Sequence, residues 1–141
     1  MTATSTPLDG MDTSQVEMME ELCLCLDEND NVIDSSSKLT SHYGEGIRHR
    51  AFSVLIFDSN DRLLVQQRST DKITFPGVWA NSCCSHPLNI AGENGDAVEG
   101  VIHAARRKLA QELGIPENVP KVGNSTILVN LNTNVVGTKI G

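Results

Sequence analysis

Several features are missing from this 141-residue sequence, and each absence excludes a class of protein. No apolar run approaches the ~20 residues of a membrane-spanning helix, so we expect no membrane segment. The first 30 residues contain neither Lys nor Arg, which argues against a secretory or mitochondrial presequence. The net charge of -7 makes a general nucleic-acid surface a poor hypothesis, so we expect no nucleic-acid partner.

The four cysteines also lack the pattern of a disulfide framework. Cys83 and Cys84 are adjacent and poorly placed to bond each other, and Cys23 and Cys25 would share one face of a strand. We therefore expect a reducing, cytoplasmic setting. A peroxisomal address remains possible for a full-length form, because it would sit at the natural C-terminus.

The sequence does contain short strands on both sides of one strong helix. Its length and 39% apolar content support a single domain with one core. The patterns predict a polar loop over 35–48 and a flexible connection over 92–95. Strands are predicted at 22–26, 32–33, 51–57, 63–67 and 126–131, with 51–57 and 63–67 forming a hairpin across the turn 58–61.

The helix is predicted to begin after Asp96 and to end at Gly114. Asp96 is typical of an N-cap with Glu99 completing a capping box, and Gly114 followed by a proline is typical of a helix end. Its apolar residues recur at helical spacing, at Val98, Ile102, Ala105, Leu109 and Leu113. Strands before and after this helix predict an α+β layered domain.

The segment from Thr74 to Pro87 carries the most informative chemistry, a thiol two residues from an imidazole in a Pro- and Gly-rich stretch. Cys84 near a bound cation could give or take a proton, although its residue type fits a buried structural cysteine equally well. His42, His49 and His86 could bind a transition metal as neutral imidazoles. Their spacing is no standard zinc pattern, and scattered histidines are more often surface residues.

Charged residues add a second set of candidates. Glu112 near the helix end could ligate Mg²⁺, or it could simply pair with Lys108 one turn earlier. Arg68 and Lys72 lead into the Cys/His segment and could hold a diphosphate, or they could flank a solvated turn.

Five ordered segments together resemble the type I isopentenyl-diphosphate isomerases of the Nudix superfamily. They are HRAFS at 49–53, LLVQQRS at 63–69, KITFPGVW at 72–79, CCSHPL at 83–88 and RRKLAQELGI at 106–115. The resemblance runs from about Val16 to Pro116. It implies a mixed sheet packed against helices and the interconversion of isopentenyl and dimethylallyl diphosphate, two building blocks of isoprenoids and sterols.

The resemblance also implies roles for particular residues. Cys84 would be the catalytic thiol, and His42, His49 and His86 would bind a divalent metal, which is Zn²⁺, Mn²⁺ or Mg²⁺. Glu112 would help to hold Mg²⁺ on the substrate. Four residues would contact the small-molecule isoprenoid diphosphate, namely Lys38, Arg68, Lys72 and Ser85.

Two departures from the family pattern shape our expectations for this chain. Ordinary Nudix hydrolases carry two more acids where this helix has Lys108 and Gln111, and those acids bind the divalent ions that activate water. Their absence argues against diphosphate hydrolysis, which is the alternative function. The family's Glu-x-Glu pair has no counterpart after Gly114, where Glu117 is the single acid. We therefore expect a domain whose C-terminal part is missing, with little turnover or a non-catalytic remnant. The predicted organisation is a flexible segment 1–15, a Nudix portion 16–116 and a divergent tail 117–141.

Overall fold

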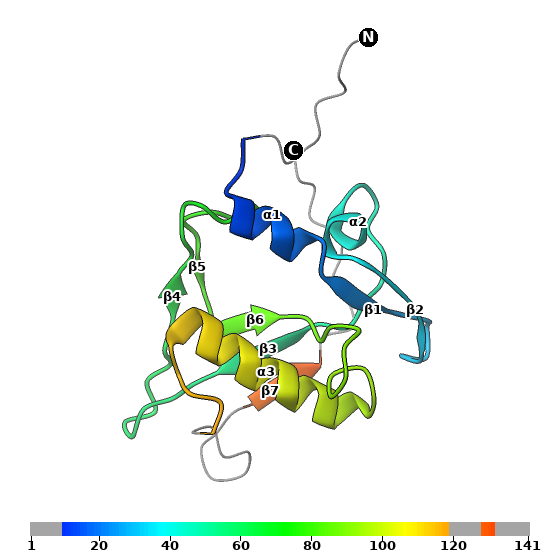
Figure 1. Ribbon diagram of the computed structural model, residues 1–141. Coiled ribbons are helices and arrows are strands. Elements are labelled where there is room, and N and C mark those ends of the chain that lie inside the picture. Colours follow the sequence, from blue (N-terminus) through cyan, green and yellow to red (C-terminus); the bar gives the residue numbers. More distant parts are fainter. Residues whose placement is uncertain (1–9, 119–127, 132–141) are drawn as a thin grey trace.

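The computed structural model describes residues 10–118 and 128–131, and these form an α+β arrangement (Figure 1). The predicted fold class is therefore confirmed, and every strand pairing in this part of the chain is antiparallel. The helices are α1 (Thr13–Met19), α2 (Lys38–His42) and α3 (Ala97–Leu113). The strands are β1 (Leu22–Leu26), β2 (Val32–Ser37), β3 (Phe52–Leu55), β4 (Gln66–Gln67), β5 (Trp79–Ala80), β6 (Cys83–Ser85) and β7 (Leu128–Leu131).

Two helices near the N-terminus were not predicted from the sequence. The α1 helix begins at Thr13, inside the segment expected to be loose, because the Asp12 carboxylate accepts hydrogen bonds from the Ser14 and Gln15 amides. The predicted polar loop 35–48 was wrong over its first eight residues, where β2 continues to Ser37 and α2 follows at once. The Ser37 hydroxyl caps α2 by accepting from the Thr40 amide.

The predicted hairpin between 51–57 and 63–67 is formed only at its turn. Phe57 and Leu63 make an isolated bridge, and the Leu64 amide donates to the Ile56 carbonyl at 2.8 Å. Beyond that point the strands diverge. The β3 strand lies between β6 and β7 in a three-stranded sheet, whereas β4 pairs with β5. Both edges of β3 are thus paired with strands that are distant in the sequence.

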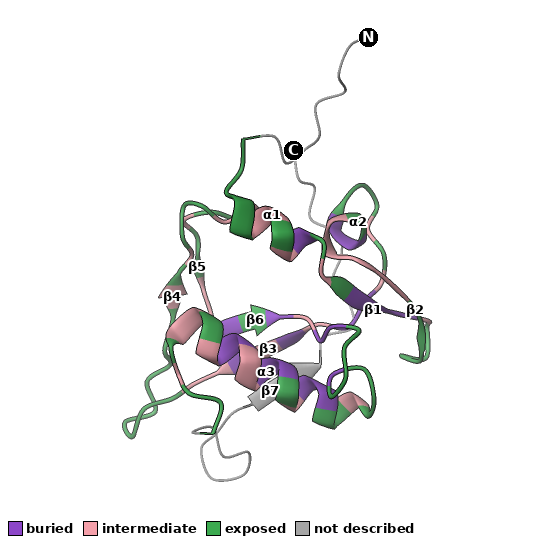
Figure 2. Ribbon diagram, viewed as in Figure 1, coloured by how far each residue is buried: buried purple, intermediate pink, exposed green. Residues whose placement is uncertain are grey.

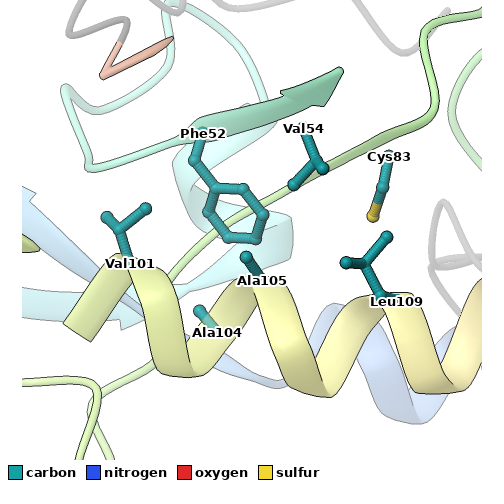
Figure 3. Packing of buried hydrophobic residues seen from close by; sticks show 7 residues of the cluster. All are labelled: Phe52, Val54, Cys83, Val101, Ala104, Ala105 and Leu109. Atoms are coloured by element: carbon teal, nitrogen blue, oxygen red, sulfur yellow. The ribbon is translucent and has the colours of Figure 1, made fainter. Parts of the chain in front are cut away.

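The α3 helix forms between the residues predicted for it. The Asp96 carboxylate accepts from the Val98 and Glu99 amides at 2.9 and 3.0 Å, and Gly114 ends the helix with a φ of 65°. The predicted apolar stripe is rotated in the structure: Val98 is exposed, and Val101 and Ala104 are buried instead. Phe52, Val54 and Cys83 from the sheet meet Val101, Ala104, Ala105 and Leu109 of α3 (Figure 3).

Burial is concentrated on β1, β6 and the sheet-facing side of α3 (Figure 2). The predicted strand 126–131 is represented by β7, and residues 126–127 lie outside the described part of the chain. No helix among residues 10–118 combines the length and apolar character needed to cross a membrane. All four cysteines, which the structure describes, are free thiols, as predicted.

Candidate active site and metal centre

One cavity of about 320 Å³ gathers most of the residues singled out from the sequence. Its lining residues come from α1, α2, β3, β6, α3 and the loop 68–75. Figure 1 shows α1 and α2 on one side of the molecule and β3, β6 and α3 on the other. Eight of the nine candidate residues line it: Lys38, His42, Arg68, Lys72, Cys84, Ser85, His86 and Glu112. The ninth, His49, is 1% exposed and lies behind the wall, in contact with two of them. Segments up to 74 residues apart in sequence therefore meet at one place.

The three histidine rings pack against one another. The ring centroids of His42 and His49 are 4.7 Å apart, those of His49 and His86 are 4.8 Å apart, and those of His42 and His86 are 5.0 Å apart. The α2 helix supplies His42, the segment before β3 supplies His49, and His86 follows the last residue of β6. The sequence spacing gave no indication of this convergence, which the fold alone produces.

Backbone carbonyls fix the protonation of two of these rings. The Nδ1 atom of His42 donates to the Lys38 carbonyl at 2.7 Å, and that of His49 donates to the Ile47 carbonyl at 2.6 Å. With the proton on Nδ1, each Nε2 carries a lone pair that can bind a metal. Burial lowers the pKa of both rings and holds the pKa of His86 well below its usual value. Burial therefore favours the neutral form of all three imidazoles, which metal binding requires.

Unpaired polar atoms in this cluster fit a metal ion. Nε2 of His49 and Nδ1 of His86 are buried and have no hydrogen-bond partner. Such atoms are rare in folded proteins and call for a specific explanation. One donor atom from each of Cys23, His49 and His86 lies within 4.8 Å of the other two. The described residues thus contain a Cys/His/His group that could hold a metal ion.

Cys23 is a candidate metal ligand that the sequence did not indicate. The sequence predicted only a free cysteine on a strand. Its place on β1 gave no signal, because a cysteine in an apolar strand is usually structural. Only the packing of β1 beside His49 and His86 reveals it.

The Cys84 thiol lies at the cavity surface, whereas Cys83 is buried in the core, as their alternation along β6 predicts. The Cys84 thiol donates to the Asn81 side-chain oxygen at 2.7 Å and lies 3.3 Å from the Ser53 hydroxyl. Neither Asn81 nor Ser53 was identified from the sequence. Both contact the thiol of Cys84, which lines the same cavity as His42 and His86.

Cationic side chains outnumber anionic ones in the wall of the cavity. Lys38, Arg68, Lys72 and Lys108 line the cavity, against a single carboxylate, Glu112. This local excess of positive charge stands out in a chain whose net charge is -7. A cavity with such a charge favours an anionic ligand.

Each of these cations is held in place. Lys38 pairs with Glu21 at 3.1 Å. The Arg68 guanidinium donates to the Thr74 and Phe75 carbonyls and to the Thr74 hydroxyl, so it closes the loop that forms one cavity wall. Ordered cations lose less side-chain entropy when they bind a ligand than mobile ones do.

Glu112 is surrounded by positive charge. Lys108 and Lys72 lie 3.4 and 3.7 Å from its carboxylate, and the Gln66 amide donates to it at 3.3 Å. Burial alone would raise the pKa of Glu112, but the two ammonium groups outweigh burial, and the pKa is lowered. The i, i+4 pair with Lys108 considered from the sequence is therefore formed. Glu112 also faces the cavity, so pairing and ligand contact are compatible.

An ion pair between Glu93 and Arg107, which the sequence did not indicate, holds the segment that carries His86. The Glu93 carboxylate accepts from the Arg107 side chain at 2.6 and 2.9 Å and from the Leu88 amide at 2.9 Å. Arg107 also donates to the His86 carbonyl at 3.4 Å. The connection 92–95, predicted to be merely flexible, thus contains a buried carboxylate that holds the backbone on both sides of Pro87.

The fold and this site define a Nudix-type domain, and comparison with known families agrees. The chain belongs to the NUDIX domain family, whose family model matches residues 47–130. This match extends 14 residues past Pro116, where the sequence resemblance was judged to end.

Curated relatives share a more particular name. The chain is 54% identical over 125 residues to the isopentenyl-diphosphate delta-isomerase of Aspergillus fumigatus, covering 82% of this chain and 45% of that protein. It is 50% identical over 125 residues to the enzyme of the same name from Gibberella zeae, covering 82% and 49%. It is 51% identical over 119 residues to that of Schizosaccharomyces pombe, covering 78% and 52%. The chain spans about half the length of these relatives.

Proposed function

We propose that this chain carries the thiol, imidazole and diphosphate-binding part of an isopentenyl-diphosphate isomerase. The observation that supports this most directly is the single cavity in which Cys84, two of the three histidines and four cations meet. The relatives' name supplies the substrate class, an isoprenoid diphosphate. A cytoplasmic setting is part of the same proposal, because the free thiols suit a reducing compartment.

The cationic wall would bind the diphosphate end of the substrate. Arg68 offers a planar guanidinium, while Lys38 and Lys72 act as point charges. Ser85, buried at the cavity edge, would contact the same substrate. Binding energy from this charged end would then position the small hydrocarbon end, which offers few groups to recognise.

The Cys84 thiol would transfer a proton at one face of the alkene. Isomerisation adds a proton at one carbon and removes another from a different carbon, so it requires an acid and a base on opposite faces. Asn81 and Ser53 hold the sulfur in position for one of these transfers. The family resemblance assigns the second transfer to a carboxylate of a Glu-x-Glu pair, which this 141-residue sequence does not contain after Gly114. We therefore expect slow turnover from this chain.

His42, His49 and His86 would hold a divalent metal, and Glu112 would contribute to Mg²⁺ on the diphosphate. The metal supplies positive charge that stabilises a nearby carboxylate or phosphate oxygen. The buried nitrogens without partners on His49 and His86 fit this role. The Glu112 carboxylate is already paired with Lys72 and Lys108. For Glu112 to bind Mg²⁺, at least one of these lysines would have to pair with the anionic substrate instead.

Hydrolysis of a diphosphate is the second candidate function, and the position of Lys108 argues against it. Hydrolysis in this superfamily uses several acids on the α3 helix to bind several Mg²⁺ ions. Here the Lys108 ammonium is buried 3.4 Å from Glu112, in the place of one such acid. A fixed positive charge at this position repels the divalent ions that would activate water.

Ligand binding by the 141-residue chain tests the proposal. Calorimetric titration with isopentenyl diphosphate should show binding, and Lys72→Gln should weaken it about tenfold, since a charge-assisted contact contributes ~1.5 kcal/mol. Arg62→Gln is the matched control, because Arg62 is exposed and pairs with Asp58 outside the cavity. Equal affinity in the Lys72 variant would contradict the assigned binding wall.

Product analysis separates the alternatives. With Mg²⁺ present, we expect little dimethylallyl diphosphate and no phosphate release. Phosphate release would favour the hydrolase, and turnover at the rate of a full-length relative would refute the need for further carboxylates. Failure to bind any diphosphate would leave only the non-catalytic remnant.

A further inference from the structure

We propose that the Cys23 thiol is itself a ligand of the metal ion at the histidine cluster, which makes this a nitrogen–sulfur site suited to Zn²⁺. The family resemblance assigned only imidazoles and carboxylates to the metal. This inference shares with the proposed function a metal at the histidines, and it does not depend on isomerisation.

The backbone explains why Cys23 reaches the histidines. One edge of β1 pairs with β2, and the other edge is joined to both histidine-bearing segments. Cys23 forms a bridge with Leu88, two residues after His86. The Arg50 amide, one residue after His49, donates to the Leu24 carbonyl at 2.9 Å. The strand is thus fixed with Cys23 next to both ring-bearing segments.

The donor atoms lie close enough for small shifts to bring them to one metal ion. Those of Cys23, His49 and His86 are all within 4.8 Å of one another. A tetrahedral Zn²⁺ with bonds of about 2.0–2.3 Å holds its ligand atoms ~3.5 Å apart. Closing the remaining gap requires shifts of about 1 Å or less, which side-chain rotation can supply.

Unpaired nitrogens distinguish this cluster from an ordinary buried cysteine. Cys23 is 0% exposed and His49 is 1% exposed, so neither is solvated. The buried Nε2 of His49 and Nδ1 of His86 have no partner. A purely structural cysteine explains neither of these nitrogens, whereas a metal bound between the three residues satisfies both.

The donor set also selects the metal. Imidazole and thiolate ligands favour Zn²⁺ and related transition metals, while Mg²⁺ prefers oxygen ligands. A thiolate would also compensate part of the metal's charge in a site that contains neutral rings and no carboxylate in the identified donor group. The histidine site would therefore take Zn²⁺ or Co²⁺ in preference to Mg²⁺.

Cobalt spectroscopy of the 141-residue chain tests this directly. Bound Co²⁺ should give a near-ultraviolet sulfur-to-cobalt charge-transfer band, and Cys23→Ser should abolish it and weaken Zn²⁺ binding about 10- to 100-fold. Cys25→Ser is the matched control, since Cys25 is a buried cysteine on the same strand outside the donor group. Persistence of the band in Cys23→Ser, or its loss in Cys25→Ser, would overturn the proposal.

X-ray absorption of the zinc-loaded wild type gives a result that needs no variant. A sulfur neighbour at about 2.3 Å is expected, and a shell of nitrogen and oxygen alone would overturn the inference while leaving a histidine-bound metal intact. If circular dichroism shows that Cys23→Ser does not fold, the charge-transfer bands of the Co²⁺-loaded Cys25→Ser and Cys84→Ser variants provide the test. Retention of the band in both variants supports Cys23 as the sulfur ligand, and its loss in either variant contradicts that assignment. Failure of the wild type to bind Zn²⁺ or Co²⁺ would refute both this inference and the histidine metal site.

Discussion

The apolar core beneath α3 and the histidine corner are both buried, yet their composition differs. The core consists of seven residues from β3, β6 and α3 that contact one another (Figure 3). The histidine corner, comprising Cys23, Ser41, His42, His49 and His86, contains three of the four buried unpaired side-chain polar atoms found in the described residues. Unpaired buried polar atoms cost stability. The comparison teaches that the core provides stability, whereas the corner, where we propose a metal ion, holds unpaired polar atoms at some energetic cost.

The largest loss of stability is expected from a change at Arg107, which joins α3 to the histidine corner. Arg107 extends from α3 to the buried Glu93 and to the His86 carbonyl. Arg107→Met would leave the buried Glu93 carboxylate without its cationic partner, and the free energy of unfolding should fall by about 3–5 kcal/mol. Urea denaturation measures this loss. Arg106→Met removes the same charge from the same helix and should cost far less, and equal losses would show that the Glu93 contact has no special role.

A large effect is also expected in the core itself. Leu109 is 1% exposed, and Leu109→Ala should lower the free energy of unfolding by about 2–5 kcal/mol through the cavity it creates. The partly buried Leu113 provides the control, for which a smaller loss is expected. Metal affinity of the folded Leu109 variant should stay unchanged. A change in Zn²⁺ affinity by calorimetry would show that core and corner are not separate.

A smaller change in stability is expected when a metal ion binds at the histidine corner. At 100 times its dissociation constant, Zn²⁺ should stabilise the chain by about 2.7 kcal/mol, which raises the melting temperature by roughly 5–10 °C. A chelator should reverse the shift, and His49→Gln should abolish it. His103→Gln, at an exposed position of α3, should keep the full shift. An equal metal-induced shift in both variants would contradict binding at the corner.

The smallest perturbation is chemical labelling of the thiols, which should leave the fold intact. Burial raises the pKa of Cys23 and Cys83 to about 12, so at pH 8 only about one ten-thousandth of each is thiolate. Cys84 is exposed at the cavity. Iodoacetamide should therefore modify Cys84 first, as read by peptide mass spectrometry. Preferential labelling of Cys23 would show that the corner opens to solvent.

Local sequence signals were sufficient for some elements. Asp96 and Gly114 correctly marked the two ends of α3, because a cap depends on hydrogen bonds within a few residues. The Asp58 turn was also correct, since that carboxylate accepts from the Asn60 and Arg62 amides. The hairpin built on this turn failed, because β3 found better partners in β6 and β7.

The candidate site was only partly accessible to sequence reasoning. Residue type and resemblance identified Cys84, the three histidines and the cations, and their roles remain predictions. Cys23, Asn81 and the Glu93–Arg107 pair carried no local signal, since each acts through a contact with a distant segment.

The sequence by itself determined the boundaries of α3 and the free state of the cysteines, and it supplied the candidate reactive groups, because these depend on local hydrogen bonds and on residue chemistry. Only the tertiary structure decided which strands pair with β3, which face of α3 is buried, and that Cys23 lies close to His49 and His86. Those outcomes depend on the packing of segments distant in the chain, where burial and strand pairing outweigh local preference.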